Sequence, residues 1–364
     1  MVYTFHHLTI QEFVAALAQF LTPYILMPTH TTPPNLTPLL DIAHSDRDGR
    51  FQIFLRFLIG LSDPYTKSLL NELLGTLSSE TTRQVIDWIQ RIFENIGIET
   101  SISGKSDKKG DLLNILHYLF ESQNKPLMKA TIGTLKKIDL SRNRLSPVDC
   151  IVMAADLQTC EMVEEIDLDS CYIQTEGIQR LVSVLHRCKS LRLGNNNLGY
   201  CGVKRLCEAL RNPECKVQSL VLDSNNLTAD CTEELASALN TNHSLKELKL
   251  NSNKLGDCGV KRLCEALRNP ECKIQRLELG VNRLTDGCTD DLVSALSTRR
   301  SLRLLDLRFN SFTDGSVPAL RRLIQTCTSL EEIVLFDNRL SRVGENQLLS
   351  LQGFRAELTV SVKH

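Results

Sequence analysis

The 364-residue chain has few aromatic side chains and no excess of charge of either sign. Aromatic residues make up 5% of it, and 42 Lys and Arg residues against 43 Asp and Glu residues give a formal net charge of −1. A global positive field that would attract nucleic acid or an anionic membrane is therefore missing. The most apolar stretch, residues 13–27, is interrupted by Gln19, Thr22 and Pro23, short of the ~20 apolar residues that a spanning helix needs. We expect no nucleic-acid partner and no membrane span.

Cysteine is absent before Cys150, and the 13 cysteines of the chain contain no C-x-x-C pair. This density is low for a disulfide-stapled scaffold, and the spacing does not suit zinc. Four cysteines recur at one offset, which shows that they were copied with a repeat: Cys201/Cys258, Cys207/Cys264, Cys215/Cys272 and Cys231/Cys288. We expect reduced, buried thiols in a cytoplasmic protein, and no metal site.

An internal repeat organises the second half of the chain. The segment CGVKRLCEALRNPECK at residues 201–216 returns unchanged at residues 258–273. A shorter pattern, L-x-x-L-x-L-x-x-N-x-L, starts at residues 135, 163, 188, 217, 245, 274, 302 and 330, at intervals of 25 to 29 residues. That length accommodates a strand, a turn, a helix and a return loop. The 25-residue interval predicts a short helix around residues 178–184.

Asparagine occupies one position of this pattern in seven of the eight copies, and Cys171 stands there in the other. An asparagine amide can bond turn backbone groups that a strand ladder leaves unpaired. We therefore expect a structural role for Asn143, Asn196, Asn225, Asn253, Asn282, Asn310 and Asn338.

The repeats resemble the ribonuclease-inhibitor-type leucine-rich repeat, which alternates units of 28 and 29 residues. The resemblance implies an α/β horseshoe in which the strands form one parallel sheet on the concave side and the helices cover the convex side. Residues 357–362 are expected to add a cap strand. Basic helix pairs such as Lys204-Arg205 alternate with acidic pairs such as Glu233-Glu234, which predicts ion pairs between neighbouring repeats.

Strand positions between the core leucines are expected to face the concavity. The candidate contacts with a ligand or partner are Asp167, Asp169, Arg192, Asp223, Lys249, Glu278, Asp306, Arg308, Val334 and Phe336. Ordinary solvated strand faces explain most of these residues equally well. The acids could act as proton donors and acceptors, but we expect them to face open solvent, with no pocket to shift their pKa values.

Signatures of an enzyme are missing from the sequence. No G-x-S-x-G occurs, and no H-E-x-x-H accompanies His6-His7. We expect no catalytic residue and no enzymatic activity.

Before residue 133, helix signals replace the asparagine pattern. Thr9 and Glu12 form a capping box ahead of an apolar face made of Ile10, Phe13, Val14, Leu17 and Phe20. Asp63-Pro64 and Gly75 bound another helix. Further helices are indicated over residues 51–61, 80–95 and 111–121, so an all-α domain precedes the repeats.

Three segments resemble the NOD-like receptors, cytosolic nucleotide-binding immune sensors with leucine-rich repeats: YTFHHLTIQEFVAAL at 3–17, FQIFLRFLIGLSD at 51–63 and DLLNILHYLFES at 111–122. The resemblance implies the end of a winged helix over residues 1–22, the second helical domain over 23–132 and about eight repeats with a cap strand over 133–364. The chain would be the C-terminal portion of such a receptor, as a fragment or a truncated product.

The resemblance also implies an upstream nucleotide-binding domain that takes ATP or ADP. Gly104-Lys105-Ser106 imitates only the end of a phosphate-binding loop, so we expect no cofactor in this chain.

By the same resemblance, the chain is a non-enzymatic, cytoplasmic module for protein interaction, ligand sensing and autoinhibition in innate immune signalling. Its partner would be a protein, a pathogen- or danger-derived ligand, or the upstream nucleotide-binding domain. A ribonuclease-inhibitor-like soluble inhibitor or another leucine-rich-repeat scaffold is the alternative, and the helical first 130 residues argue against it. We also expect an exposed apolar patch within residues 1–20, where winged-helix partners of Tyr3, Phe5 and Leu8 are missing.

Overall fold

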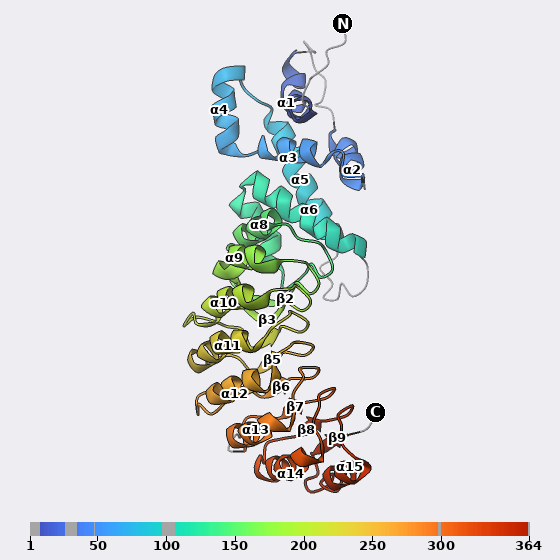
Figure 1. Ribbon diagram of the computed structural model, residues 1–364. Coiled ribbons are helices and arrows are strands. Elements are labelled where there is room, and N and C mark those ends of the chain that lie inside the picture. Colours follow the sequence, from blue (N-terminus) through green and yellow to red (C-terminus); the bar gives the residue numbers. More distant parts are fainter. Residues whose placement is uncertain (1–7, 26–34, 47, 97–105, 298–299, 363–364) are drawn as a thin grey trace. The chain divides into compact units, whose positions relative to one another are not determined.

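The computed structural model describes residues 8–25, 35–46, 48–96, 106–297 and 300–362. The chain divides into a helical unit, residues 1–135 with 155–161, and a repeat unit, residues 136–154 with 162–364 (Figure 1). The expected boundaries at residues 22 and 132 remain predictions. Among the described helices, none combines the length and the apolar character that a membrane crossing requires.

The described part of the helical unit contains helices and no strand. Its elements are α1 (Leu8–Ile25), α2 (Thr37–Ser45), α3 (Gln52–Gly60), α4 (Pro64–Leu74), α5 (Ser79–Asn95), α6 (Ser106–Ser122), α7 (Lys125–Ala130) and the 3-10 turn η1 (Ile132–Thr134). The helices predicted over 51–61, 80–95 and 111–121 are confirmed. Asp63 caps α4 as expected, because its carboxylate accepts a hydrogen bond from Thr66 N at 2.9 Å. The sequence patterns did not predict α2 and α7.

The start of α1 differs from the prediction. Thr9 lies inside the helix and is not its cap, and Oε2 of Glu12 is buried without a hydrogen-bond partner. Ile10 and Val14 are 54% and 40% exposed, so the expected apolar face is only partly buried. The helix instead packs on α3 through a narrower stripe, in which the ring of Phe13 lies 5.4 Å from that of Phe57.

An aromatic cluster forms the centre of the helical unit. The rings of His44, Trp88 and Tyr118 lie 5.6 to 5.8 Å apart, and Trp88 and Tyr118 are almost fully buried. Trp88 Nε1 donates to Asp41 Oδ1 at 2.8 Å, which satisfies the indole. Burial lowers the pKa of His44, which favours the neutral imidazole.

The repeat unit contains one parallel sheet of nine strands in chain order. Its strands are β1 (Lys137–Asp139), β2 (Val163–Asp167), β3 (Cys188–Arg192), β4 (Ser219–Val221), β5 (Glu247–Lys249), β6 (Arg276–Glu278), β7 (Leu304–Asp306), β8 (Glu332–Val334) and β9 (Thr359–Ser361). Strand β9 pairs with β8 and confirms the expected cap strand.

A helix follows each of the first eight strands. The helices are α8 (Pro147–Leu157), α9 (Gln174–Leu185), α10 (Gly199–Leu210), α11 (Ala229–Thr241), α12 (Gly256–Leu267), α13 (Thr289–Leu296), α14 (Val317–Thr326) and α15 (Arg342–Leu349), with 3-10 turns η2 (Asp286–Cys288) and η3 (Asp314–Ser316). They lie on one side of the sheet (Figure 1). Leu220 and Leu222 are fully buried between the two layers, so the expected α/β horseshoe of leucine-rich repeats is confirmed.

The 25-residue repeat keeps a full-length helix, so the prediction of a short one was wrong. Helix α9 has 12 residues, as many as α10. The deficit lies in the return loop: Cys188 begins β3 soon after α9 ends at Leu185, whereas β4 begins at Ser219 after α10 ends at Leu210.

Eleven of the 13 cysteines are buried, and Cys201 and Cys258 are exposed. The expectation of burial is therefore wrong for this one repeated position. Cys201 lies two residues before Val203, the first residue of the apolar stripe of α10, and a two-residue step turns a side chain about 200° around a helix.

Candidate protein-interaction surface

The parallel register aligns the side chains on the open face of the sheet in columns. One column, here called the central column, consists of Asp139, Asp167, Arg192, Val221, Lys249, Glu278, Asp306, Val334 and Ser361. Six of the ten candidate binding residues belong to it. The other four, Asp169, Asp223, Arg308 and Phe336, lie one pleat further on, where the ladder continues through bonds such as Phe309 N to Phe336 O at 3.0 Å. The fold thus brings the ten candidates onto one face.

Opposite charges on this face pair with each other. Arg192 Nε lies 3.1 Å from Asp167 Oδ2, and a second nitrogen of the same guanidinium contacts Asp169. Lys249 Nζ lies 2.9 Å from Glu278 Oε1. Arg308 Nε lies 3.1 Å from Asp306 Oδ2. The alternating signs therefore form local pairs, and no large field of one sign results.

The carboxylates of this face are less exposed than the sequence suggested. Burial raises the pKa of Asp167, Asp223 and Asp306 above the ordinary value for aspartate, and Asp306 is 4% exposed. Strands about 4.8 Å apart press neighbouring side chains together, and a single sequence pattern does not reveal this crowding. For these three aspartates, the prediction of open solvent and unshifted pKa values was wrong.

These acids already accept hydrogen bonds from the backbone. Asp223 Oδ1 accepts from Asn251 N at 2.8 Å, and Asp306 Oδ1 accepts from Arg308 N at 3.0 Å. They therefore help to fix the rim of the sheet, as well as presenting charge.

The asparagine positions form a ladder behind the strands. Asn225 Oδ1 accepts from Asn196 N at 3.1 Å, and its Nδ2 donates to Leu193 O at 2.8 Å. Equivalent amide-to-carbonyl bonds are made by Asn196, Asn253, Asn282, Asn310 and Asn338. Asn143 differs, because its Nδ2 is buried without a hydrogen-bond partner. In the next copy, the Cys171 thiol takes the amide's place and donates to Leu140 O at 3.1 Å.

Ion pairs connect neighbouring helices, as predicted. Glu234 of α11 lies 2.6 Å from Arg211 and 3.7 Å from Lys204, both from the preceding repeat. Asp291 of α13 makes the same contacts with Arg268 and Lys261. The charged side chains of these helices therefore pair with each other across the contacts between repeats.

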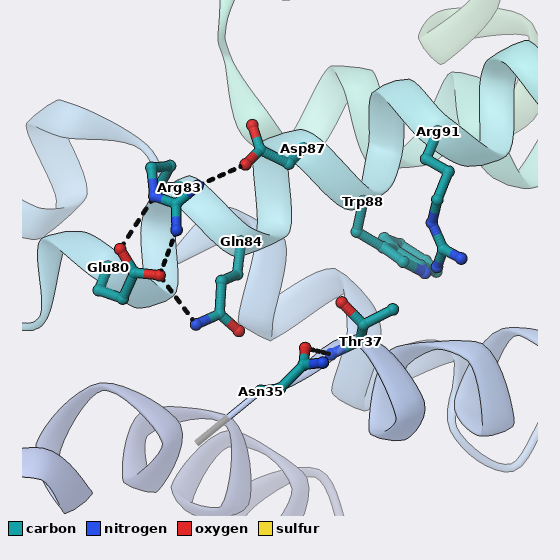
Figure 2. Close-up of a pocket in the computed structure, with 8 residues that line it drawn as sticks. All are labelled: Asn35, Thr37, Glu80, Arg83, Gln84, Asp87, Trp88 and Arg91. Atoms are coloured by element: carbon teal, nitrogen blue, oxygen red, sulfur yellow. Dashed lines mark hydrogen bonds and ion pairs between the residues drawn. The ribbon is translucent and has the colours of Figure 1, made fainter. Parts of the chain in front are cut away.

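A polar pocket of about 400 Å³ lies on the helical unit (Figure 2). Its lining residues are Asn35, Thr37, Glu80, Arg83, Gln84, Asp87, Trp88 and Arg91. Arg83 bridges Glu80 and Asp87 at 2.9 Å each, and the hydrogen bond from Arg83 lowers the pKa of Glu80. Sequence reasoning missed this pocket, because its residues come from α5 and from the distant start of α2 with the preceding Asn35. Its charges compensate each other, so we assign it no ligand.

The described residues contain no group of three or more His, Cys, Asp or Glu side chains placed to hold a metal ion. His6, His7, Gly104 and Lys105, considered as ligand or phosphate-loop candidates, lie outside the described residues, as do Tyr3 and Phe5.

Comparison with known proteins matches both units. The family model described as NLRC4 helical domain HD2 matches residues 7–130, and two leucine-rich-repeat models match residues 241–264 and 301–323. Human NACHT, LRR and PYD domains-containing protein 3 is 37% identical over 62% of this chain and 22% of its own length. Mouse NACHT, LRR and PYD domains-containing protein 5 is 36% identical over 55% of this chain and 18% of its own length.

Pig ribonuclease inhibitor is 35% identical over 64% of this chain and 52% of its own length. The chain therefore spans about a fifth of the receptors and about half of the inhibitor. The helical match distinguishes the two kinds of relative, because it precedes the repeats in the order expected for a receptor. The chain is thus similar to the HD2 helical domain and the leucine-rich repeats of the NOD-like receptors, in that order along the sequence.

Proposed function

We propose that the chain is the non-enzymatic recognition module of a cytosolic innate immune receptor, and that the open face of its sheet senses a protein or a pathogen- or danger-derived ligand. The observation that supports this proposal is the alignment of the candidate residues in columns across consecutive strands. A repeat scaffold of this kind is rigid and presents an extended surface. Nucleotide chemistry would belong to an upstream domain, with no cofactor in this chain.

Charge pairing on the face suits reversible binding. Arg192 and Lys249 are partly exposed, with side chains 38% and 27% accessible. Their carboxylate partners are mostly buried, with side chains 14% accessible at Asp167 and 12% at Glu278, so a partner can reach the two cations with its own acidic groups while the pairs keep the cations in place. We propose that autoinhibition uses the same face. It would hold the upstream domain in an inactive state until a ligand displaces that domain.

Site-specific photo-cross-linking tests the proposal. Benzoylphenylalanine at Arg276, which is exposed on the strand face, should give discrete adducts with a cytosolic protein. The same probe at Arg205 on the outer side of α10 is the matched control, because its side chain is 45% accessible, and it should give none of these adducts. Absence of adducts at position 276, or identical adducts at both positions, contradicts the proposal.

Similarity to ribonuclease inhibitor favours a second candidate, a soluble ribonuclease inhibitor. An inhibition assay with the purified chain and a pancreatic-type ribonuclease distinguishes the two. We expect no inhibition at micromolar chain, and stoichiometric inhibition would favour the second candidate.

A further inference from the structure

Two apolar side chains occupy unusual backbone positions at the edge of the sheet. The residue before each asparagine of the repeat adopts a left-handed conformation, and Val281 and Phe309 do so with φ of 56° and 55°. The other residues of this position are Arg142, Ser170, Asn195, Ser224, Ser252 and Asp337. A β-branched side chain at positive φ is costly and rare. Polar residues therefore suit the position, and the backbone conformation alone does not favour valine or phenylalanine.

Both side chains are exposed, and they lie in consecutive repeats. Val281 is 43% and Phe309 is 46% exposed. The two line the same concavity of about 330 Å³, together with Ser252, Asn253, Lys254, Arg283, Asn310 and Ser311. The ring of Phe309 lies 5.5 Å from that of Phe336, edge to face, so the neighbouring repeat holds it in place. We call these lining residues the Val281/Phe309 surface.

The charge at this surface has one sign. Lys254 and Arg283 are its two charged residues, and none of the eight lining residues is acidic. Lys254 Nζ donates to Asn226 Oδ1 at 3.2 Å, which holds the amine at the rim. In the next repeat, Asp337 occupies the backbone position that Phe309 occupies in its own repeat. We take this aspartate as the end of the surface. A ligand would therefore place its negative charge toward Lys254 and Arg283 and away from Asp337.

We propose that the Val281/Phe309 surface docks an acidic, extended segment of a partner protein that inserts one large apolar side chain between Val281 and Phe309. Its flanking carboxylates would pair with Lys254 and Arg283. This inference rests on the proposed recognition function and specifies one surface and one partner chemistry for it.

A nucleic acid fits the surface less well. Binding a single strand requires a continuous track of cations along the phosphates together with stacking platforms. The surface offers two cations, and an acid stands at its end. An apolar centre with a charged rim is instead typical of protein contacts.

Fluorescence anisotropy with the full chain tests the proposal. The probe is a fluorescein-labelled peptide, Gly-Glu-Asp-Leu-Phe-Glu-Asp-Gly, at low salt. Phe309→Ser and Val281→Ser introduce serine, which occupies the equivalent position of two other repeats as Ser224 and Ser252. The variant repeats should therefore still fold. We expect each to weaken binding at least about tenfold, as loss of a central apolar anchor does. Arg283→Glu should weaken it similarly.

Matched controls lie elsewhere on the repeat unit. Val343→Ser removes an apolar side chain that is 64% exposed on α15, and Lys216→Glu reverses an exposed charge. Both should bind like the unchanged chain, and a peptide with serine at its two apolar positions should not bind.

Three results would overturn the proposal: no binding of the peptide, equal affinity of Phe309→Ser and the unchanged chain, or displacement of the peptide by a single-stranded oligouridine. If one of these results is obtained and cross-linking at Arg276 still gives adducts, the docking proposal fails and the recognition function stands. If those adducts are also absent, the recognition function itself fails.

Discussion

At the scale of single residues, Asp156 is a carboxyl buried in an unfavourable environment. It is fully buried near the end of α8, and neither carboxylate oxygen has a hydrogen-bond partner. Burial raises its pKa to about 8. Sequence analysis could not identify it, because its neighbours MAADLQ give no sign that the side chain points inward.

Replacing Asp156 by asparagine should make folding less sensitive to pH. In the unfolded chain the carboxyl ionises near pH 4, whereas in the folded chain it keeps its proton to about pH 8. Between these values, each pH unit lowers the free energy of unfolding by about 1.4 kcal/mol. Asp156→Asn removes this penalty, so it should raise the stability relative to the unchanged chain more at pH 8 than at pH 5.5, by about 3 kcal/mol.

Urea denaturation at the two pH values measures this difference. Asp230→Asn is the control, because this carboxylate has a side chain that is 81% accessible, and it should leave the pH dependence unchanged. An unchanged pH dependence in Asp156→Asn would show that the carboxyl is not protonated in the folded chain.

At the scale of elements, the sequence predicted those helices that have strong local signals. Helix α4 has Asp63 and Pro64 at its start and Gly75 at its end, and these residues act locally. Helix α2 was missed because it is short and Leu36 at its start offers no side-chain cap, and α7 because it has only six residues. The length of α9 was predicted wrongly, because the number of residues between two repeat starts does not show whether the helix or the return loop is shorter.

The asparagine ladder connects one element to the next, which leads to a graded prediction. Asn225→Ala removes bonds to Asn196 N and Leu193 O and leaves buried backbone groups unpaired. It should cost about 2 to 4 kcal/mol of unfolding free energy. Asn143→Ala is the matched control at the same repeat position, where Nδ2 is buried without a partner, and it should cost less than about 1 kcal/mol.

Chemical denaturation followed by circular dichroism compares the two variants. Equal destabilisation, or a larger effect at Asn143, would mean that the amide bonds do not stabilise the turns.

At the scale of the whole molecule, the sequence predicted that a helical domain precedes the leucine-rich repeats. This was possible because each repeat contains its own sequence signals for a strand, a turn and a helix. The alternation of the strand predicted that the candidate residues share the open face of the sheet. Their burial and pairing were not predictable, because Arg192 meets Asp167 from a strand 25 residues away. The Val281/Phe309 surface was also missed, because the neighbours of a left-handed residue become visible only in the folded sheet.

Amide hydrogen exchange of the full chain, alone and with the protein cross-linked at Arg276, tests the central claim most directly. We predict slower exchange in strands β3 to β8 and in the loops that follow them, with α10 to α13 unchanged, because the partner covers the open face of the sheet. Protection confined to the helices of the repeats, or to residues 8–130, would contradict the assignment of this face as the recognition surface.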